Sequence, residues 1–440
     1  MSKKSYIFDT SVFLSDAQSV KHYKDGNIVI PFKVLEEIDN HKKRQDGVGS
    51  NARNIIRILD ELRAEGSLRE GVQLNEGPFL YVKNAVQAHE SYADLLPKDL
   101  DLSNPDNEII AVALMEKYLN DDTVVVSRDI NMRVKCDALG LKSEDYVAGQ
   151  IVETKDSVYE GTNNCIVEDK VVDSFYANEG VVLNGEYNLC PNQYITLESA
   201  DNPKKTALAR YFSDKAPLGK IIDYRGVWGV RPRNKEQRFM IDLLMDEKVP
   251  IVSLIGKAGS GKTLCALASG LEQVVETSTN CRYNRLIVSR PIQPMGKDIG
   301  YLPGTMEEKM TPWLAPIQDN LKYLMGNDKH AFDMYLDRGV IEIEALTYIR
   351  GRSISDAYII IDECQNMTMH EIKTILTRVG ENTKIVLLGD IEQIDNIYID
   401  ETTNGLTYVI EKFKEHELAG HVTLKKGERS AVATLAAKVL

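Results

Sequence analysis

The sequence is poor in several features that would place it in a familiar class. Its six cysteines are scattered and form no C-x-x-C pair, which argues against a disulfide framework or a zinc ribbon. No apolar run approaches the roughly 20 residues that span a bilayer, and the first residues lack the apolar stretch of a secretory signal. We therefore predict a cytoplasmic protein with no membrane segment. Its metal ions, if it binds any, should be hard cations held by carboxylates.

Basic residues are also scarce relative to acids. The chain has 53 Lys and Arg against 66 Asp and Glu, a formal net charge of −13. This balance argues against a broad basic surface that binds any polyanion, but a local basic path for RNA remains compatible with it. A length of 440 residues exceeds one ordinary hydrophobic core, so we expect two domains with a smaller segment between them.

The pattern of apolar residues predicts this organisation in more detail. Residues 1–150 alternate short buried strands with helices, which indicates an α/β domain around a parallel sheet. Residues 151–225 are rich in Val, Tyr, Gly and Asn and predict a β-rich connecting segment that could form a small barrel. The alternation of strand and helix returns over 226–440 and predicts a second α/β domain.

A phosphate-binding loop opens the second α/β domain. Residues 256–263 read GKAGSGKT, a full match to G-x-x-x-x-G-K-[ST] between an apolar strand pattern and a helix pattern. Such a loop wraps its backbone N–H groups around phosphate oxygens at a helix N-terminus. We expect ATP to be held by Gly256, Gly259, Ser260, Gly261, Lys262 and Thr263. Lys262 should reach the β- and γ-phosphates, and Thr263 should bind Mg²⁺.

Two further motifs complete a nucleotide hydrolysis site. The buried strand pattern 358–361 ends in Asp362 and Glu363. We expect Asp362 to bind Mg²⁺ through water and Glu363 to polarise the attacking water. The next strand pattern, 385–388, leads to Gln393, which could sense the γ-phosphate or could simply belong to a polar turn.

Five motifs in order resemble the PhoH-type ATPases, over roughly 226–440. They are the loop 256–263, residues 300–304, residues 350–352, residues 362–366 and residues 389–393. The resemblance implies a RecA-like P-loop fold in which Gln237 reads the adenine and Arg429 acts as an arginine finger. Without the resemblance, Arg429 would be read as a surface arginine. A single ATPase core lacks the second wall of a helicase, so we expect a homo-oligomer, such as a hexameric ring, with Arg429 or Arg290 acting across the subunit boundary.

Four acids of the first domain follow strand patterns or open helix patterns. They are Asp9, Glu37, Asp106 and Asp129, with Glu36 as an alternative to Glu37. Carboxylates gathered at one edge of a sheet repel one another unless a divalent ion neutralises them, and such an ion can activate water for attack on a phosphodiester. Taken singly, each acid could equally cap a helix, turn the chain or lie on a solvated face.

Residues 1–150 resemble the PIN domains, on the stretches 9–14, 31–39, 106 with its helix and 127–131. That family consists largely of Mg²⁺- or Mn²⁺-dependent ribonucleases. The resemblance implies that the four acids hold the metal, that Ser11 replaces a common Asn, and that Asn131 supports Asp129. The whole chain thus resembles fused PIN–PhoH proteins.

The resemblance implies ATP-driven RNA unwinding or translocation coupled to metal-dependent RNA cleavage, on single-stranded or tailed duplex RNA. The alternative is an ATP-gated RNA-binding or assembly switch with a weak nuclease domain. Residues 41–44 (HKKR), Tyr301 and Trp313 are candidate RNA contacts, although a solvated helix end and ordinary packing explain them as well.

Overall fold

The computed structural model describes most of the chain. The described residues are 4–44, 47–74, 77–84, 96–97, 100–146, 151–152, 154–183, 187–275, 281–291, 306–326, 328–346, 353–396 and 399–427, without the side chains of 306–313, 329 and 345. The chain divides into two compact units, Met1–Gln150 and Ile151–Leu440.

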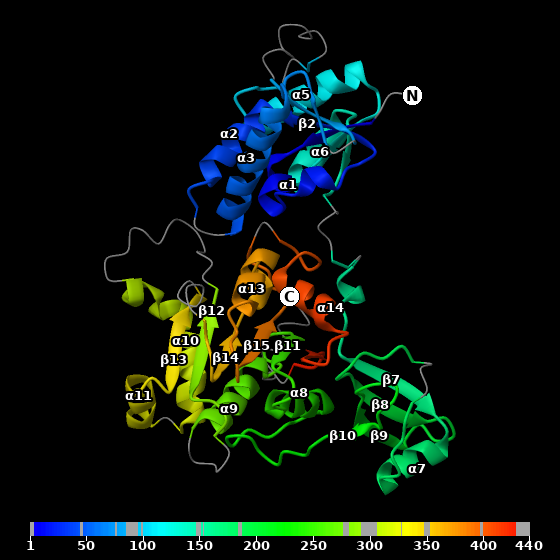
Figure 1. The fold of residues 1–440 in the computed structure, drawn as a ribbon, viewed down its shortest axis with the longest axis vertical. Coiled ribbons are helices and arrows are strands. Elements are labelled where there is room, and N and C mark those ends of the chain that lie inside the picture. Colours follow the sequence, from blue (N-terminus) through cyan, green and yellow to red (C-terminus); the bar gives the residue numbers. More distant parts are fainter. Residues whose placement is uncertain are drawn as a thin grey trace. The chain divides into compact units, whose positions relative to one another are not determined.

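The first unit is built on a mainly parallel sheet (Figure 1). Its strand order is β3-β4-β2-β1-β5-β6, and only β3 runs antiparallel to its neighbour. The strands are β1 (Lys4–Phe8), β2 (Gly26–Pro31), β3 (Val72–Gln73), β4 (Phe79–Lys83), β5 (Thr123–Val126) and β6 (Lys142–Glu144). The helices are α1 (Thr10–Ser15), α2 (Phe32–His41), α3 (Gly47–Glu65), α5 (Pro105–Leu119) and α6 (Ile130–Ala138), with a 3-10 turn η1 (Ser19–Lys21).

Short polar residues begin three helices of this unit at the carboxyl edge of the sheet. Asp9 caps α1 directly after β1, and Asp129 caps α6 three residues after β5. Asn104 caps α5, whose first residue, Pro105, has the fixed φ that suits a first helical turn. Because parallel strands end at the same edge, the helix starts that follow them bring distant acids together.

The second unit begins with a four-stranded sheet of order β10-β9-β8-β7. Its elements are β7 (Thr162–Val167), α7 (Asp169–Ala177), β8 (Tyr194–Ser199), β9 (Thr206–Arg210) and β10 (Gly219–Lys220), after a 3-10 turn η3 (Lys155–Ser157). Helix α7 packs on one face, where Val172 and Phe175 join a core with Ile195 and Leu197. In place of a barrel, the described strands give a sheet whose edge strands β7 and β10 do not pair with each other.

A buried polar network joins this small sheet to helix α8 (Lys235–Met245). The guanidinium of Arg210 on β9 lies 3.3 Å from Asp242 and 2.8 Å from Asp246. The hydroxyl of Tyr194 donates to Asp242 at 2.8 Å, and the backbone N–H of Ile222 donates to its other oxygen. The sheet is therefore held against the helix by charges that have little access to water.

The rest of the second unit is a six-stranded, wholly parallel sheet of order β13-β12-β14-β15-β11-β16 (Figure 1). The strands are β11 (Ile251–Gly256), β12 (Arg285–Arg290), β13 (Ile341–Ala345), β14 (Ala357–Ile361), β15 (Lys384–Gly389) and β16 (Ala419–Leu424). The helices are α9 (Lys262–Val274), α10 (Met306–Leu324), α11 (Lys329–Asp337), α13 (Met369–Leu376) and α14 (Gly405–Phe413), with a 3-10 turn η5 (Cys364–Asn366).

Alternate side chains of these strands enter two separate cores. Leu254 and Ile360 pack with residues of α8 and α9, whereas Ile255 and Ile361 pack with residues of α13 and α14. A parallel sheet with helices on both faces needs this apolar content on both sides. The expected α/β class, with a parallel-sheet domain on either side of a β-rich segment, is confirmed.

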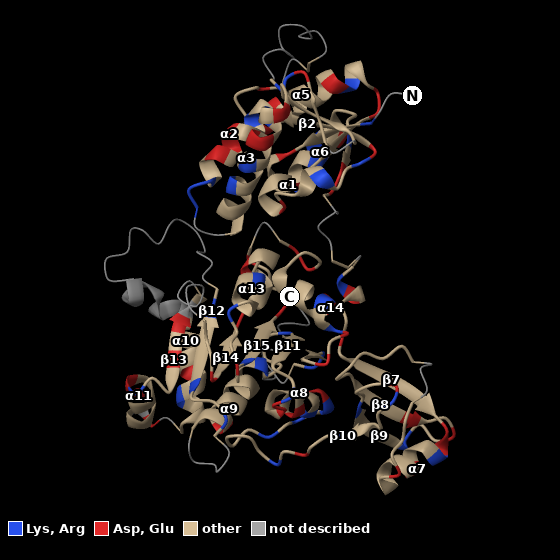
Figure 2. Cartoon of the chain, in the orientation of Figure 1, with Lys and Arg blue, Asp and Glu red and all other residues tan. Residues whose placement is uncertain are grey.

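No helix in the described part of the chain is long and apolar enough to cross a membrane. Acidic and basic residues are interspersed over both units, and acidic residues are conspicuous on α2 (Figure 2).

Candidate functional sites

The loop between β11 and α9 has the backbone shape of a phosphate cradle. Gly259 and Gly261 have φ angles of 79° and 89°, in the left-handed region that favours glycine. The buried hydroxyl of Ser260 has no hydrogen-bond partner among the described residues. Helix α9 begins at Lys262, so its free N–H groups and positive end face the loop. These features fit the phosphates of a bound nucleoside triphosphate.

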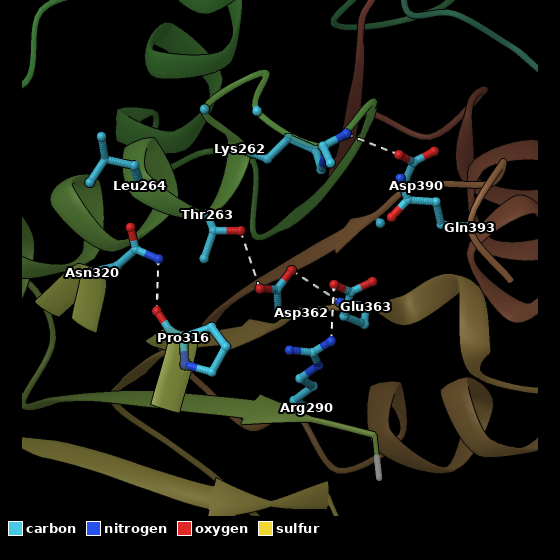
Figure 3. A pocket seen from close by; sticks show the side chains of 14 residues that line it. Lys262, Thr263, Leu264, Arg290, Pro316, Asn320, Asp362, Glu363, Asp390 and Gln393 are labelled. Atoms are coloured by element: carbon cyan, nitrogen blue, oxygen red, sulfur yellow. Dashed lines mark hydrogen bonds and ion pairs between the residues drawn. The ribbon is translucent and has the colours of Figure 1, made fainter. Parts of the chain in front are cut away.

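A cavity of about 290 Å³ lies against this loop (Figure 3). Its lining includes the loop, the ends of β14 and β15, and part of α10. The side chain of Lys262 reaches back over the loop, where its Nζ donates to the backbone oxygens of Gly256 and, at 3.3 Å, of Lys257. Seven predicted site residues line this cavity together: Gly259, Gly261, Lys262, Thr263, Asp362, Glu363 and Gln393.

Thr263 and Asp362 are placed as a pair that could hold Mg²⁺. The Thr263 hydroxyl donates to Oδ2 of Asp362 at 3.2 Å (Figure 3). Burial raises the pKa of Asp362 above its usual value, and the adjacent charge of Glu363 raises it further. A divalent cation would relieve both effects, because it compensates the buried negative charge. The donor set of one hydroxyl and carboxylate oxygens suits a hard cation.

Glu363 points into the cavity from a strained backbone. Its φ of 57° is unusual for a residue with a side chain. One carboxylate oxygen is 3.2 Å from the guanidinium of Arg290, and the other accepts from Gln365 at 2.5 Å. Both described candidates for the terminal phosphate, Arg290 and Gln393, line the same cavity in one chain (Figure 3).

Gln237 lies beside the loop without lining the cavity. Its Nε2 donates to the backbone oxygen of Ser260 at 3.0 Å, and its Oε1 accepts from the backbone N–H of Arg233 at 2.8 Å. The side chain is nearly fully buried, and a Cβ at Gly261 would lie 3.1 Å from its Nε2. In this arrangement Gln237 supports the loop, and its role in reading adenine stays a prediction.

Several predicted residues lie outside the described part of the chain. They are Arg429, Tyr301, residues 300–304 and residues 350–352, together with the side chain of Trp313. Their assigned roles stay predictions.

In the first unit, Asp9 is the most buried of the predicted acids, at 6% exposure. It accepts hydrogen bonds from the hydroxyls of Ser11 and Ser127, both at 2.6 Å, and from the backbone N–H of Thr10 at 2.7 Å. Burial raises its pKa above the usual value, and the charge of Asp106 raises it further. Ser11, which stands where PIN domains commonly carry Asn, therefore keeps a small hydrogen-bonding side chain that orients the acid.

The negative charges of Asp9, Glu37 and Asp106 lie close enough to affect one another. Glu37 accepts a hydrogen bond from the hydroxyl of Thr10. Burial raises the pKa of Glu37, and the charges of Asp9 and Asp106 contribute. Asp106, in the first turn of α5, forms an ion pair of 2.8 Å with Lys135 on α6. Three acids from distant points of the chain thus influence one another, as expected for carboxylates that could share a hard cation.

Asp129 differs from these three acids. Its side chain is exposed and caps α6 by accepting from the backbone N–H of Asn131 at 2.8 Å. Over the described ranges, no three His, Cys, Asp or Glu side chains lie close enough to hold a metal ion as they stand. Glu36, the alternative to Glu37, is exposed and pairs with Lys33.

The candidate basic RNA contact at residues 41–44 is exposed or half-buried. Lys42 pairs with Asp39 one helical turn away, and the backbone oxygens of Lys42 and Arg44 accept from Arg53. These bonds within the chain are those of an ordinary helix end. RNA contact by this stretch stays a prediction.

The site also contains residues that sequence reasoning did not single out. Asp390 accepts from the backbone N–H of Ala258 at 3.0 Å and so fixes the start of the phosphate loop. Gln365 bonds to Glu363 and to the backbone around residue 390. Thr10 and Ser127 orient Glu37 and Asp9. The signal in the sequence was that Gln365 and Asp390 stand inside the short motifs 362–366 and 389–393, and that Thr10 and Ser127 stand inside the stretches 9–14 and 127–131.

Comparison with known proteins assigns the family. The profile described as "PhoH-like protein" matches residues 229–438, and the profile described as "PIN domain" matches residues 6–147. Protein PhoH2 of Bacillus subtilis is 43% identical over 99% of this chain and 100% of its own length. The chain is a PIN–PhoH fusion of the PhoH family. Protein PhoH2 of Thermobispora bispora is 35% identical over 99% of this chain and 96% of its own length.

The PhoH part also has relatives without full-length similarity. Protein PhoH of Escherichia coli is 32% identical over 49% of this chain and 59% of its own length. PhoH proteins are P-loop ATPases, and PIN domains are usually nucleases. PhoH-type ATPases generally use ATP, which the phosphate loop binds. PIN domains generally use Mg²⁺ at their acidic site. The expected resemblance to a PIN–PhoH fusion is confirmed.

Proposed function

We propose that this PIN–PhoH chain hydrolyses ATP to translocate along RNA and unwind it, and that its PIN domain cleaves RNA with Mg²⁺ or Mn²⁺. The observation that carries the proposal is that one chain holds two separate acid-bearing sites. One joins a phosphate cradle to Asp362 and Glu363. In the other, Thr10 donates hydrogen bonds to both Asp9 and Glu37, and the charge of Asp106 acts on both acids.

Each residue of the ATPase site has a role in the proposal. The loop N–H groups and Lys262 bind the phosphates, which draw Nζ away from the backbone oxygens it contacts. A bound Mg²⁺ would neutralise the phosphate charge, with Thr263 and Asp362 as its protein partners. Glu363 orients the attacking water and accepts its proton. Gln393 contacts the terminal phosphate, and Arg429 acts as an arginine finger across a boundary in a homo-oligomer, such as a hexameric ring.

In the PIN domain, Asp9, Glu37 and Asp106 would hold the divalent ion, with Asp129 at the rim. A bound ion would activate water and stabilise the charge that develops on the phosphate. Ser11, Ser127 and Thr10 keep the acids oriented. Lys135 now pairs with Asp106, and its release by the ion would leave an ammonium group close to the phosphate of bound RNA. We place the protein in the cytoplasm, where its substrate is made.

A second candidate function has a specific observation in its favour. Asp106 is ion-paired, Asp129 caps a helix, and the described acids form no ready metal cluster. These features would suit a PIN domain that binds RNA and cleaves it poorly, in a protein that acts as an ATP-gated switch.

One pair of assays decides between these functions. ATP turnover is measured with and without single-stranded RNA, and RNA cleavage is measured in Mn²⁺ for the wild type and Asp9→Asn. The proposal expects RNA to stimulate turnover, and it expects cleavage that Asp9→Asn removes. RNA-stimulated turnover without any cleavage by the wild type would favour the switch. Absence of turnover under both conditions would overturn the ATPase half of the proposal.

A further inference from the structure

Gln365 is a fully buried amide at the centre of the ATPase site. It lies in the single turn η5, four residues after β14 ends at Ile361 and two residues after Glu363, and its exposed fraction is 0%. Its Nε2 donates to Oε2 of Glu363 at 2.5 Å and to the backbone oxygen of Gln393 at 2.9 Å. Its Oε1 accepts from the backbone N–H of Asp390 at 3.1 Å. Both ends of the amide are therefore committed to the site.

The partners of Gln365 come from separate elements that must act together. Glu363 follows β14, whereas Asp390 and Gln393 follow β15. Asp390 in turn accepts from the backbone N–H of Ala258, in the phosphate loop that follows β11. A continuous chain of hydrogen bonds thus runs from the carboxylate of Glu363 through one amide to the loop that would hold the phosphates.

The amide of Gln365 lies very close to the backbone of Gly389 at the end of β15. A Cβ at Gly389 would lie 2.7 Å from Oε1 of Gln365 and 3.2 Å from its backbone nitrogen. Glycine at position 389 therefore permits the close approach of the amide to β15. Glu363 has a left-handed backbone conformation that costs energy, and such a conformation persists only where neighbouring bonds determine it. The hydrogen bond from Gln365 and the one from Arg290 hold this carboxylate in place.

We propose that Gln365 is a positioning residue for ATP hydrolysis, which holds the carboxylate of Glu363 and the 389–393 loop in one arrangement around the terminal phosphate. The proposal rests on the proposed hydrolysis of ATP by this site. Gln365 does not line the cavity, so it acts through Glu363, Asp390 and Gln393. Removing it lets these groups move independently, and displacements of about 1 Å from productive geometry can cost about 100-fold in rate.

Two substitutions distinguish the hydrogen bonds of the Gln365 amide from the volume of its side chain. Gln365→Met keeps the volume and removes all three hydrogen bonds. Gln365→Glu keeps an acceptor for the backbone N–H of Asp390 and places a like charge against Glu363. The matched control is Gln273→Met. Gln273 is also a buried amide, and its side chain on α9 donates to the backbone oxygens of Leu244 on α8 and Ser269 on α9. ATP turnover, affinity for a fluorescent ATP analogue and thermal midpoint are measured for all four proteins.

We expect Gln365→Met to lower kcat by about 10- to 100-fold and to leave the analogue's affinity within about threefold of wild type. Gln365→Glu should lower kcat at least as much, because it removes the donor to Glu363 and places a like charge against that carboxylate. Gln273→Met should change the thermal midpoint by a comparable amount and leave kcat unchanged.

The outcomes that contradict the proposal are distinct from a failure of the proposed function. A wild-type protein that binds the analogue but hydrolyses no ATP overturns the function, and the role of Gln365 with it. If the wild type hydrolyses ATP and Gln365→Met has a normal kcat, the proposed role of Gln365 is overturned and the proposed function stands. A loss of kcat that Gln273→Met reproduces, or a loss of analogue affinity in Gln365→Met as large as its loss of kcat, would assign Gln365 a purely structural role and also overturn the proposal.

Discussion

Arg210→Met should strongly destabilise the second unit, because it breaks the buried network between β9 and α8. The Arg210 and Asp242 side chains are only 6% and 5% exposed, and they lie 3.3 Å apart. Arg210 also bonds to Asp246 at 2.8 Å and to the side chain of Asn192 at 2.7 Å. Removing one partner of a buried ion pair leaves the other charge uncompensated, which costs about 3–5 kcal/mol.

This loss is measured by thermal unfolding of the full-length chain. Each kcal/mol lowers the midpoint of a large domain by roughly 2–4 °C, so the expected decrease is about 6–20 °C. Lys170→Met is the control, because the Lys170–Glu168 pair of 2.6 Å lies at the start of α7, which packs on the same small sheet, and is exposed to water. That variant should melt with the wild type.

A compensating variant tests the electrostatic reasoning itself. Arg210→Met combined with Asp242→Asn removes the unpaired charge at position 242. The Asn oxygen can still accept from the backbone N–H of Ile222, and its amide nitrogen can donate to the hydroxyl of Tyr194. The double variant should recover most of the lost stability. An Arg210→Met protein that melts within 2 °C of the wild type, or a double variant less stable than the single one, would refute the argument.

Three further predictions concern titration, metal binding and turnover. Burial lowers the pKa of His421 to about 3, so the unfolded chain binds its proton first. As the pH is lowered from about 6.5 to 3, the free energy of unfolding of the wild type should therefore fall more steeply than that of His421→Gln, by up to about 1.4 kcal/mol per pH unit. Urea unfolding at each pH measures the difference. Asp9→Asn should weaken Mn²⁺ binding by at least about 100-fold in calorimetry, and equal affinities would contradict its assignment. Glu363→Gln should bind ATP normally and release phosphate about 100-fold more slowly, a normal rate being the contrary result.

Much of the fold was predictable because local patterns and tertiary environment agree. The apolar strands 251–256 and 357–361 are buried on both faces, which is why their sequences are continuous apolar runs. The phosphate loop was predictable because its glycines are needed at positive φ. The small sheet was harder, since alternating Val, Tyr and Gly residues fit an open sheet as well as a barrel.

The parts of the site that sequence reasoning missed depend on contacts between distant residues. Gln365 gains its importance from Gly389, Asp390 and Gln393, which approach it only after β14 and β15 pair. The pairing of Asp106 with Lys135 likewise joins two helices. Asp129 was grouped with the other acids by its place after a strand, but the side-chain direction at a helix cap cannot be read from that position.

Degradation of a duplex RNA with a single-stranded tail, in Mn²⁺ with and without ATP, is the most direct test of coupled unwinding and cleavage. The wild type is compared with Lys262→Ala and Asp106→Asn. The account predicts that ATP accelerates duplex degradation, that Lys262→Ala removes only this acceleration, and that Asp106→Asn stops cleavage. Duplex degradation by the wild type at equal rates with and without ATP would contradict it.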